Sequence, residues 1–182
     1  EGDIRMGEVV NMVSLLTKGD AIIVTDVGQN QMSVARYYKF TEPNSLVTSG
    51  GMGTMGFGLP AAVGAKAGRP EKEVIAFLGD GGFQMTIQEL GTIMQYGIPV
   101  KIILLNNSFL GMVRQWQDMF FKKRYASTEL VNPDFVAIAE GFSIKAKKVS
   151  KREELKKSLA DMLAAKGPYL LDIQIEKEGN VL

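Results

Sequence analysis

The chain of 182 residues is long enough for one α/β domain with its own hydrophobic core and too short for two. A hydrophobic content of 46%, a charged content of 23% and a net charge of +1 are ordinary for a globular protein, and they give no reason to expect binding to nucleic acid or to a membrane. The chain has neither cysteine nor histidine, which excludes disulfides, thiolate nucleophiles and histidine bases, so proton chemistry would have to come from a cofactor or another polypeptide segment.

The first two predicted elements are a helix and a strand. Hydrophobic residues at helical spacing predict a helix over Met6–Leu16 that covers one face of a sheet. The apolar run Ala21–Val24 then predicts a buried strand. Asp26 follows this strand, and a carboxylate in that place is either a metal ligand or, more often, the cap of the next helix.

A glycine-rich loop follows the second predicted strand, Ser45–Thr48. Within this loop Gly51–Gly56 has the G-x-G-x-x-G pattern that binds dinucleotides when it precedes a helix, here predicted over Pro60–Ala67. A dinucleotide site also needs a ribose-binding acid about 20 residues further on, and Asp80 is a candidate. A Rossmann-like dinucleotide-binding module is therefore one alternative for this chain.

A strand–helix–strand unit occupies the centre of the chain. The apolar runs Val74–Leu78 and Val100–Leu105 are short and rich in β-branched residues, which is typical of strands buried on both faces. Between them Thr86–Tyr96 has the period of a helix, with Thr86 and Glu89 as a reciprocal capping box. Because such crossovers are right-handed, we expect the two strands to be parallel.

Polar residues follow both strands of this unit. Asp80 and Asn107 each lie just past the carboxyl end of a strand, at the edge where open α/β sheets bind ligands. A carboxylate and an amide oxygen are hard ligands that suit Mg²⁺ or Ca²⁺. The glycines around Asp80 let the main chain approach a bulky anion, and the next helix begins with free N–H groups. The pattern predicts a diphosphate held through a divalent cation.

The segment after Asn107 predicts an amphipathic helix. Met112, Val113 and Trp116 share one face of it, and packing against a core would explain these side chains without any functional role. The remaining elements complete a three-layer α/β/α sandwich whose mostly parallel sheet has about six strands. They are a helix over Asp134–Glu140 capped by Asn132-Pro133, a strand over Ser143–Val149, a helix after a capping box at Ser150–Glu153, and a last strand over Tyr169–Ile175.

The central unit resembles the motif of thiamine diphosphate (ThDP) enzymes that begins GDG and ends NN. The chain has Gly79–Gly81 and then Asn106 and Asn107, the second asparagine lying 27 positions (107 − 80) after the aspartate. In that family the aspartate, the second asparagine and the main-chain carbonyl two residues beyond it coordinate Mg²⁺. The resemblance carries these roles to Asp80, Asn107 and Phe109. ThDP would also supply its own proton transfer, through its aminopyrimidine.

Two earlier segments resemble the acetohydroxyacid synthase (acetolactate synthase) family. Residues 28–32 resemble its Gly-Gln-His-Gln-Met segment, which contacts the diphosphate, although Asn30 stands where the family has histidine. An amide can still donate a hydrogen bond to phosphate. Residues 49–62 are nearly identical to the stretch in which a large apolar side chain wedges beneath ThDP and bends it into a V. By position that side chain is Met55, and Gly53 would present its main chain to the pyrimidine.

The predicted helix after Asn107 carries a third resemblance. Its sequence over Gly111–Gln117 is similar to the family signature Gly-Met-Val-x-Gln-Trp-Gln. In that family the methionine and valine lie against the thiazolium ring and the substrate, and the tryptophan lines the pocket that favours 2-ketobutyrate as second substrate. The resemblance therefore implies catalytic roles for Met55, Met112, Val113 and Trp116. It implies cofactor contacts for Val27, Gly28, Gln29, Asn30, Gly53, Met55, Gly79, Asp80, Gly81, Gly82, Asn107, Phe109, Leu110, Gly111 and Met112.

This resemblance covers nearly the whole chain and implies that residues 1–182 are one ThDP- and Mg²⁺-binding domain, the C-terminal domain of a larger cytoplasmic subunit. Such an enzyme decarboxylates pyruvate and joins the two-carbon unit to pyruvate or 2-ketobutyrate, in the synthesis of isoleucine and valine. A second ThDP enzyme, of the pyruvate oxidase or glyoxylate carboligase type, is the alternative, and only the helix at Gly111–Gln117 separates the two.

The resemblance also implies partners. In the family the glutamate that activates the pyrimidine lies on an N-terminal domain of the opposite subunit, and a middle domain binds FAD. We therefore expect a homodimer or homotetramer, with a small regulatory subunit as a further partner. Because neither of those domains is present in 182 residues, we expect this chain alone to be inactive and to bind ThDP weakly.

Overall fold

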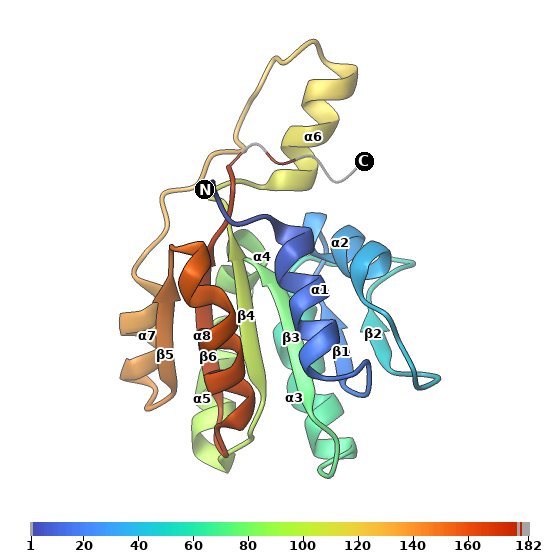
Figure 1. The fold of residues 1–182 in the computed structure, drawn as a ribbon. Helices are drawn as coiled ribbons and strands as arrows, with labels where there is room; N and C mark the ends of the chain where they lie inside the picture. Colours follow the sequence, from blue (N-terminus) through green and yellow to red (C-terminus); the bar gives the residue numbers. More distant parts are fainter. Residues whose placement is uncertain (1, 178, 180–182) are drawn as a thin grey trace.

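A computed structural model describes residues 2–177 and 179. Within them, six parallel strands form one sheet in the order β2-β1-β3-β4-β6-β5 (Figure 1). The fold class expected from the sequence, a sandwich around a parallel sheet, is confirmed. The strands are β1 (Ile22–Thr25), β2 (Leu46–Thr48), β3 (Val74–Gly79), β4 (Lys101–Asn106), β5 (Lys145–Val149) and β6 (Tyr169–Gln174).

The helices form one layer on each face of the sheet, and one helix stands apart. Helices α1, α2 and α8 cover one face, whereas α3, α4, α5 and α7 cover the other. Helix α6 lies beyond the carboxyl ends of the strands, outside both layers (Figure 1). The bounds are α1 (Met6–Leu16), α2 (Gln29–Tyr37), α3 (Gly58–Gly68), α4 (Asp80–Met85), α5 (Glu89–Tyr96), α6 (Gly111–Phe120), α7 (Phe135–Gly141) and α8 (Arg152–Ala164).

Each face of the sheet has its own hydrophobic core. Side chains alternate between faces along a strand, so Phe77 of β3 belongs to the core beneath α1 and α8, and its neighbours Ala76 and Leu78 belong to the other core. All three are fully buried. Because both faces of the central strands are covered, nearly every position along them is buried, and the strands are continuous apolar runs. Burying one large apolar side chain stabilises a fold by about 1.5–3 kcal/mol.

The direction in which successive strands are added to the sheet reverses between β1 and β3. From β1 the chain moves outward to β2 on one side, and from β3 it continues to β4 on the other. Loops that leave the carboxyl ends of β1 and β3 therefore separate, and a crevice opens between them. The opposite edge strand, β5, is rich in lysine, with Lys145 and Lys148 exposed.

Local start signals for helices were the least accurate part of the sequence prediction. Helix α4 begins immediately after β3, at Asp80, and it was not predicted. The predicted helix from Thr86 begins instead at Glu89, and its capping box is wrong because the Thr86 hydroxyl donates to the carbonyl of Gly56, 2.9 Å away. The stop at Gly97 is confirmed, since this glycine has φ = 61°.

Two other predicted caps are also wrong. Helix α8 begins after Lys151 with no side-chain cap, so the capping box expected at Ser150–Glu153 does not form. Helix α7 is capped by Asp134, whose carboxylate accepts hydrogen bonds from the main-chain N–H groups of Val136 and Ala137, both at 3.0 Å. Asn132, expected to share that role, has a different partner, described below.

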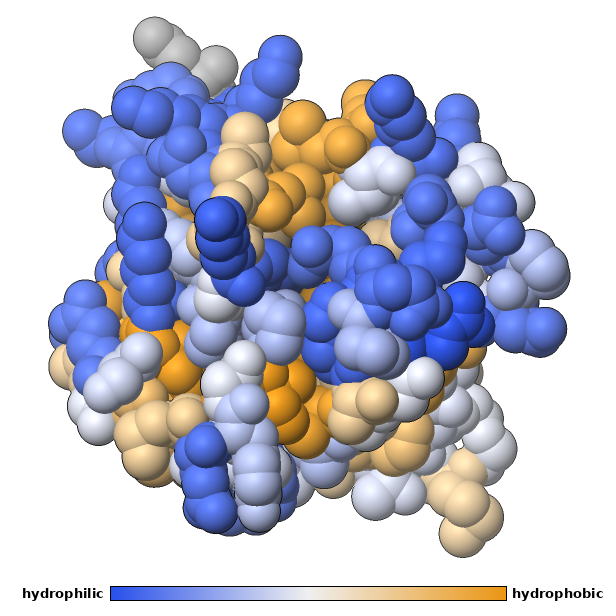
Figure 2. All heavy atoms as spheres, turned by 90° about the horizontal axis from the view of Figure 1, so that it is seen from below, coloured by the Kyte–Doolittle hydropathy of each residue, from blue (hydrophilic) through white to orange (hydrophobic). Residues whose placement is uncertain are grey.

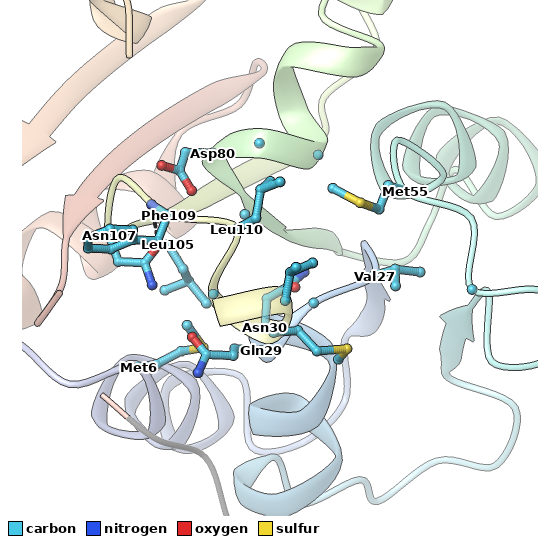
Figure 3. A pocket seen from close by; sticks show the side chains of 18 residues that line it. Met6, Val27, Gln29, Asn30, Met55, Asp80, Leu105, Asn107, Phe109 and Leu110 are labelled. Carbon is cyan, nitrogen blue, oxygen red and sulfur yellow. Dashed lines mark hydrogen bonds between the residues drawn. The ribbon is translucent and has the colours of Figure 1, made fainter. Parts of the chain in front are cut away.

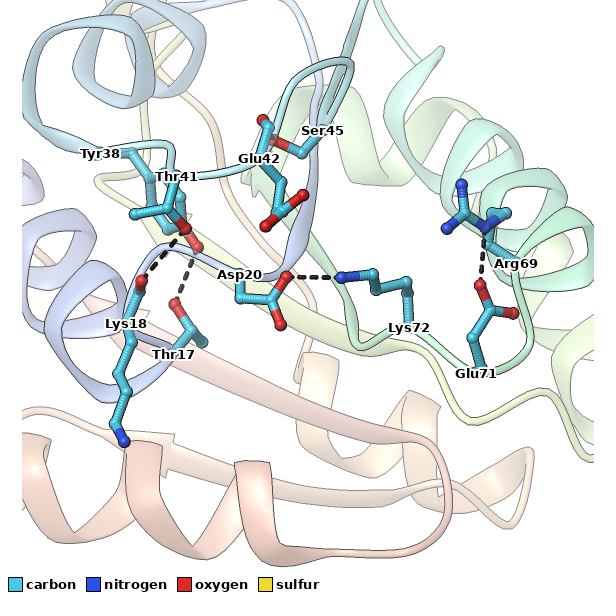
Figure 4. Close-up of polar contacts among 10 residues, drawn as sticks. All are labelled: Thr17, Lys18, Asp20, Tyr38, Thr41, Glu42, Ser45, Arg69, Glu71 and Lys72. Atoms are coloured by element: carbon cyan, nitrogen blue, oxygen red, sulfur yellow. Dashed lines mark hydrogen bonds and ion pairs between the residues drawn. The ribbon is translucent and has the colours of Figure 1, made fainter.

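Polar contacts join the loops at the end of the sheet where the strands begin (Figure 4). Lys72 pairs with Asp20 across the loops that precede β3 and β1, and the hydroxyls of Thr17 and Tyr38 lie 2.8 Å apart. Hydrophilic side chains predominate on this end of the molecule and surround smaller hydrophobic areas (Figure 2). In the described part of the chain, no helix is both long and apolar enough to cross a bilayer.

Candidate functional site

A cavity of about 160 Å³ opens at the carboxyl ends of β1, β3 and β4 (Figure 3). It lies in the crevice between the loops after β1 and β3, where ligands bind in folds of this topology. Sixteen of the residues predicted for the site border this cavity, and Met6 and Leu105 join them. The sixteen are Val27, Gly28, Gln29, Asn30, Gly53, Met55, Gly79, Asp80, Gly81, Gly82, Asn107, Phe109, Leu110, Gly111, Met112 and Val113.

Asp80 and Asn107 lie next to one another because their strands are paired in register. Gly79 of β3 is opposite Leu105 of β4, so the residues that follow both strands emerge at the same level of the sheet. Asp80, Asn107 and Phe109 lie along one side of the cavity (Figure 3). The Asn107 amide oxygen also accepts a hydrogen bond of 3.2 Å from the Phe109 N–H, which fixes the direction of the side chain.

The Asp80 carboxylate is buried, with 1% of its surface exposed. Burial raises the pKa of this carboxyl to about 6, because an ionised group loses water there, while hydrogen bonds from Asn132 and from the main-chain N–H groups of Gly81 and Ser108 act in the opposite direction. A carboxylate that is short of solvation gains more than an exposed one from a nearby cation.

Asn132 is a site residue that the sequence did not reveal. Its side-chain nitrogen donates to Asp80 Oδ2 at 2.6 Å and to Asn106 Oδ1 at 3.0 Å, and its oxygen accepts from Gln84 at 2.9 Å. Asn106 in turn donates to Asp172 at 2.9 Å. No sequence signal links Asn132 to Asp80, since an asparagine before a proline is typical of a helix cap.

The two asparagines of the predicted motif therefore have different surroundings. Asn107 borders the cavity, whereas Asn106 belongs to the buried network of Asn132 and Asp172 and supports the strand end from beneath. Burial raises the pKa of Asp172, and the hydrogen bonds from Asn106 and Gln174 oppose that shift.

The oxygen atoms at this end of β3 and β4 fit a hard divalent cation. They would come from the Asp80 carboxylate, the Asn107 amide and the Phe109 main-chain carbonyl, and all three residues border one cavity. Among the described residues, no three His, Cys, Asp or Glu side chains gather into a metal-binding cluster. A cation here would therefore rely on amide and main-chain oxygens, and Mg²⁺ commonly completes such a set with phosphate oxygens of its ligand.

Asp26 fixes the glycine-rich loop to the end of β1. It is buried and accepts hydrogen bonds from the main-chain N–H groups of Val27, at 2.6 Å, and of Gly56, at 3.0 Å. Burial raises the pKa of Asp26, and these hydrogen bonds limit the rise. Both expected roles are wrong in this structure: Asp26 does not line the cavity, and the cap of α2 is Gly28. The anchored loop places Met55 at the cavity (Figure 3).

A glycine at position 82 is required by Asp26. A Cβ atom on Gly82 would come within 2.6 Å of Asp26 Oδ2. The absence of a side chain therefore lets α4 approach the carboxylate that holds the glycine-rich loop. Glycine here serves the packing of the protein itself, in addition to the open main chain that the sequence suggested toward a bulky anion.

The side chains of Gln29 and Asn30 are directed by α2, which begins at Gln29 and was not predicted as a helix of its own. The Asn30 amide nitrogen donates to the main-chain carbonyls of Asp26, at 3.1 Å, and Phe77, at 2.7 Å. Both of its hydrogens are thus engaged in the structure, and the donation to phosphate expected from the sequence has no free hydrogen. Gln29 instead donates to Gln115 of α6 at 2.8 Å.

Helix α6 reaches the cavity with its first turn only. Met112 and Val113 border the cavity, but Trp116 does not. Trp116 is 54% exposed and stacks on Phe120 with ring centroids 5.1 Å apart. The reading of α6 as a helix packed into a core is wrong, since no residue of α6 belongs to either core.

Fold and site together define an open α/β domain that binds a ligand at the carboxyl edge of its sheet, beside the point where the strand order reverses. The family model described as "Thiamine pyrophosphate enzyme, C-terminal TPP binding domain" matches residues 26–173. The chain belongs to this family. The dinucleotide alternative is not supported, because the strand before its glycines, β2, is an edge strand, whereas a Rossmann fingerprint follows a central one.

Acetolactate synthases are among the curated relatives of the chain. It is 49% identical over 181 residues to the acetolactate synthase large subunit of Lactococcus lactis, an alignment that covers 99% of this chain and 31% of the relative. It is 48% identical over 163 residues to the isozyme 2 large subunit of Escherichia coli (89% and 30%) and 47% identical over 161 residues to the mitochondrial catalytic subunit of Saccharomyces cerevisiae (88% and 23%). The chain spans less than a third of each relative's length.

Proposed function

We propose that the chain is the ThDP- and Mg²⁺-binding domain of an acetolactate synthase. The observation that carries the proposal is the meeting of Asp80, Asn107 and Phe109 on one cavity at the ends of two paired strands. Family membership supports ThDP as the ligand, and the names of the relatives support the reaction.

The residues of the chain divide the work by their chemistry. Asp80, Asn107 and Phe109 hold Mg²⁺, and the main chain after β1 and β3 borders the diphosphate. Met55 supports the ring system from the glycine-rich loop, while Met112 and Val113 keep the reacting side of the cavity apolar. When bound, ThDP supplies the chemistry that removes CO₂ from pyruvate and passes a two-carbon unit to a second 2-ketoacid.

The proposal extends to parts outside this chain. A catalytic glutamate and FAD belong to other domains of the subunit, and a second subunit completes the active site in a homodimer or homotetramer, with a small regulatory subunit as an additional partner. We place the enzyme in the cytoplasm and in the synthesis of isoleucine and valine. Relatives of the chain include proteins named mitochondrial and chloroplastic, so cell fractionation tests the location.

Calorimetric titration with ThDP tests the cofactor assignment. We expect binding that requires Mg²⁺ and that Asp80→Ala abolishes. Asp161→Ala is the matched control, because Asp161 is an exposed residue of α8 on another part of the surface. NAD serves as the competing ligand. Equal ThDP binding with and without Mg²⁺, or binding of NAD in place of ThDP, would contradict the proposal.

Product analysis separates acetolactate synthase from other ThDP enzymes. The full-length protein is supplied with pyruvate alone and with pyruvate plus 2-ketobutyrate. We expect acetolactate in the first case and acetohydroxybutyrate in addition in the second, whereas an oxidase yields acetyl phosphate or acetate. The 182-residue chain alone is expected to yield neither product.

A further inference from the structure

Helix α6 is attached to the domain by few buried groups. Among its residues, Gln115 alone is buried. The apolar residues Val113, Trp116, Met119 and Phe120 are each between 42% and 60% exposed. Because none of them enters a hydrophobic core, the position of α6 depends on specific contacts rather than on burial of a broad apolar face.

The most buried of these contacts is a pair of glutamine side chains. Gln29, the first residue of α2, donates from Nε2 to Gln115 Oε1 at 2.8 Å, and both side chains are buried, with 6% and 8% of their surfaces exposed. The same nitrogen donates to the carbonyl of Gly179 at 3.0 Å. A hydrogen bond between two buried amides is costly to break, because water cannot readily replace it away from the surface.

The first turn of α6 is fitted to the same glutamine. A Cβ atom on Gly111 would overlap Gln29 Oε1 and would lie 3.1 Å from Asn107 Nδ2. Gln29 thus contacts α6 at two levels, through its nitrogen at Gln115 and through its oxygen at Gly111. Position 111 precedes Met112 directly, so a shift of this turn moves the residues that border the cavity.

Other contacts join α6 to the loops before and after it. Gln117 exchanges two hydrogen bonds with the main chain of Ala126, at 3.0 and 3.1 Å, on the exposed side of the helix. The Arg114 guanidinium lies over the rings of Phe109 and Tyr125. The glutamine pair, in contrast, joins α6 to the start of α2, a different part of the cavity border.

We propose that Gln115 is a positioning residue, which through its hydrogen bond to Gln29 sets the place of α6 and so of Met112 and Val113 at the cavity. The proposal rests on the proposed function only in its last step, that these two side chains face a 2-ketoacid. Its first step concerns the chain itself and is measured without any cofactor.

Amide hydrogen exchange of residues 111–120 measures that first step. Gln115→Met keeps the length of the side chain but removes the acceptor, so we expect the protection of α6 to fall about threefold to tenfold, the equivalent of one lost hydrogen bond. Gln117→Met is the control on the same helix and should change exchange mainly near Ala126. Trp116 is the only tryptophan of the chain, so its fluorescence anisotropy reports the same helix independently.

The direction of the hydrogen bond gives a second test that does not depend on how well Gln115→Met folds. Gln115→Glu retains an acceptor for Gln29 Nε2 and should keep near-native protection, whereas Gln29→Met removes the donor and should release α6. The double variant Gln29→Met with Gln115→Met should lose less protection than the sum of the two single losses, since both single variants remove the hydrogen bond of the glutamine pair.

Each outcome has a definite meaning. Native protection of α6 in Gln115→Met, or equal loss in Gln115→Glu and Gln115→Met, overturns the positioning role whatever ligand the cavity binds. Release of α6 in a chain that fails to bind ThDP supports the positioning role and contradicts the proposed function instead. In the full-length enzyme, Gln115→Met should lower kcat and alter the ratio of acetohydroxybutyrate to acetolactate. Gln115→Glu should have a kcat and a product ratio close to those of the unsubstituted enzyme.

Discussion

Asn132 donates a hydrogen bond of 2.6 Å to the Asp80 carboxylate, although the two residues are 52 positions apart in the chain. The contact holds Asp80 Oδ2 against the Asn132 side chain, and it links the start of α4 to the segment before α7. The orientation of the predicted metal ligand therefore depends on a residue that itself does not border the cavity.

Removal of this contact should weaken cofactor binding. In Asn132→Ala we expect the affinity for ThDP in the presence of Mg²⁺ to fall by about tenfold, because a hydrogen bond to a charged group is lost. Calorimetric titration measures the change. Asn11→Ala on the exposed side of α1 is the control. An unchanged affinity in Asn132→Ala would show that Asp80 is held in place without it.

Met55 should contribute to binding through its side chain. Met55→Ala removes an apolar group that borders the cavity, and we expect ThDP affinity to fall by several-fold, about 1 kcal/mol for the contact area lost. Met52→Ala, three positions earlier in the same loop, is the matched control, because Met52 is 89% exposed. Equal effects of the two substitutions in the same titration would argue against contact between Met55 and the cofactor.

Two glycines should respond in opposite directions to the same substitution. Gly82→Ala places a methyl group within 2.6 Å of Asp26 Oδ2 and should destabilise the fold by about 1–3 kcal/mol. Gly64→Ala adds a methyl group to an exposed position of α3, where a Cβ atom would lie within 4 Å of no described atom beyond its chain neighbours and the helix's own backbone, and should stabilise the helix by about 0.5–1 kcal/mol. Urea unfolding measures both, and a stabilised Gly82→Ala variant would refute the close-packing argument.

The buried carboxyl of Asp172 should make stability depend on pH. Because burial raises its pKa above the ordinary value of 3.8, the folded chain binds this proton more tightly than the unfolded chain does. The ionised form then costs stability, so the free energy of unfolding should fall as pH rises from 3.8 through the folded pKa, relative to Asp172→Asn. Urea unfolding of both proteins at a series of pH values from about 4 to about 7 measures this difference in the free energy of unfolding. A difference that stays constant with pH would exclude this contribution.

Patterns that depend on burial were predicted well from the sequence. The strands β3 and β4 and the helix α1 follow from apolar runs and helical spacing, and the pairing of β3 with β4 then brings Asp80 and Asn107 to one edge. These features are set by which residues must leave water, and that information is local in the sequence.

Features that depend on the choice of a polar partner were predicted poorly. Thr86 has the sequence context of a helix cap, yet its hydroxyl bonds to Gly56, and Asn132 bonds to Asp80 instead of capping α7. A short polar side chain has several partners of similar energy within reach, and the tertiary fold decides among them. The same reason explains why the Asn30 amide donates to the main chain of β3.

The lysines of β5 affect which surfaces of this protein can associate with a second copy. An edge strand offers unpaired main-chain groups to any other strand, but a second β5 aligned with it would bring Lys145 and Lys148 against their own duplicates. Charge repulsion therefore disfavours pairing of β5 strands between copies and the growth of fibres from this edge. Association between copies is then left to the helical and loop surfaces.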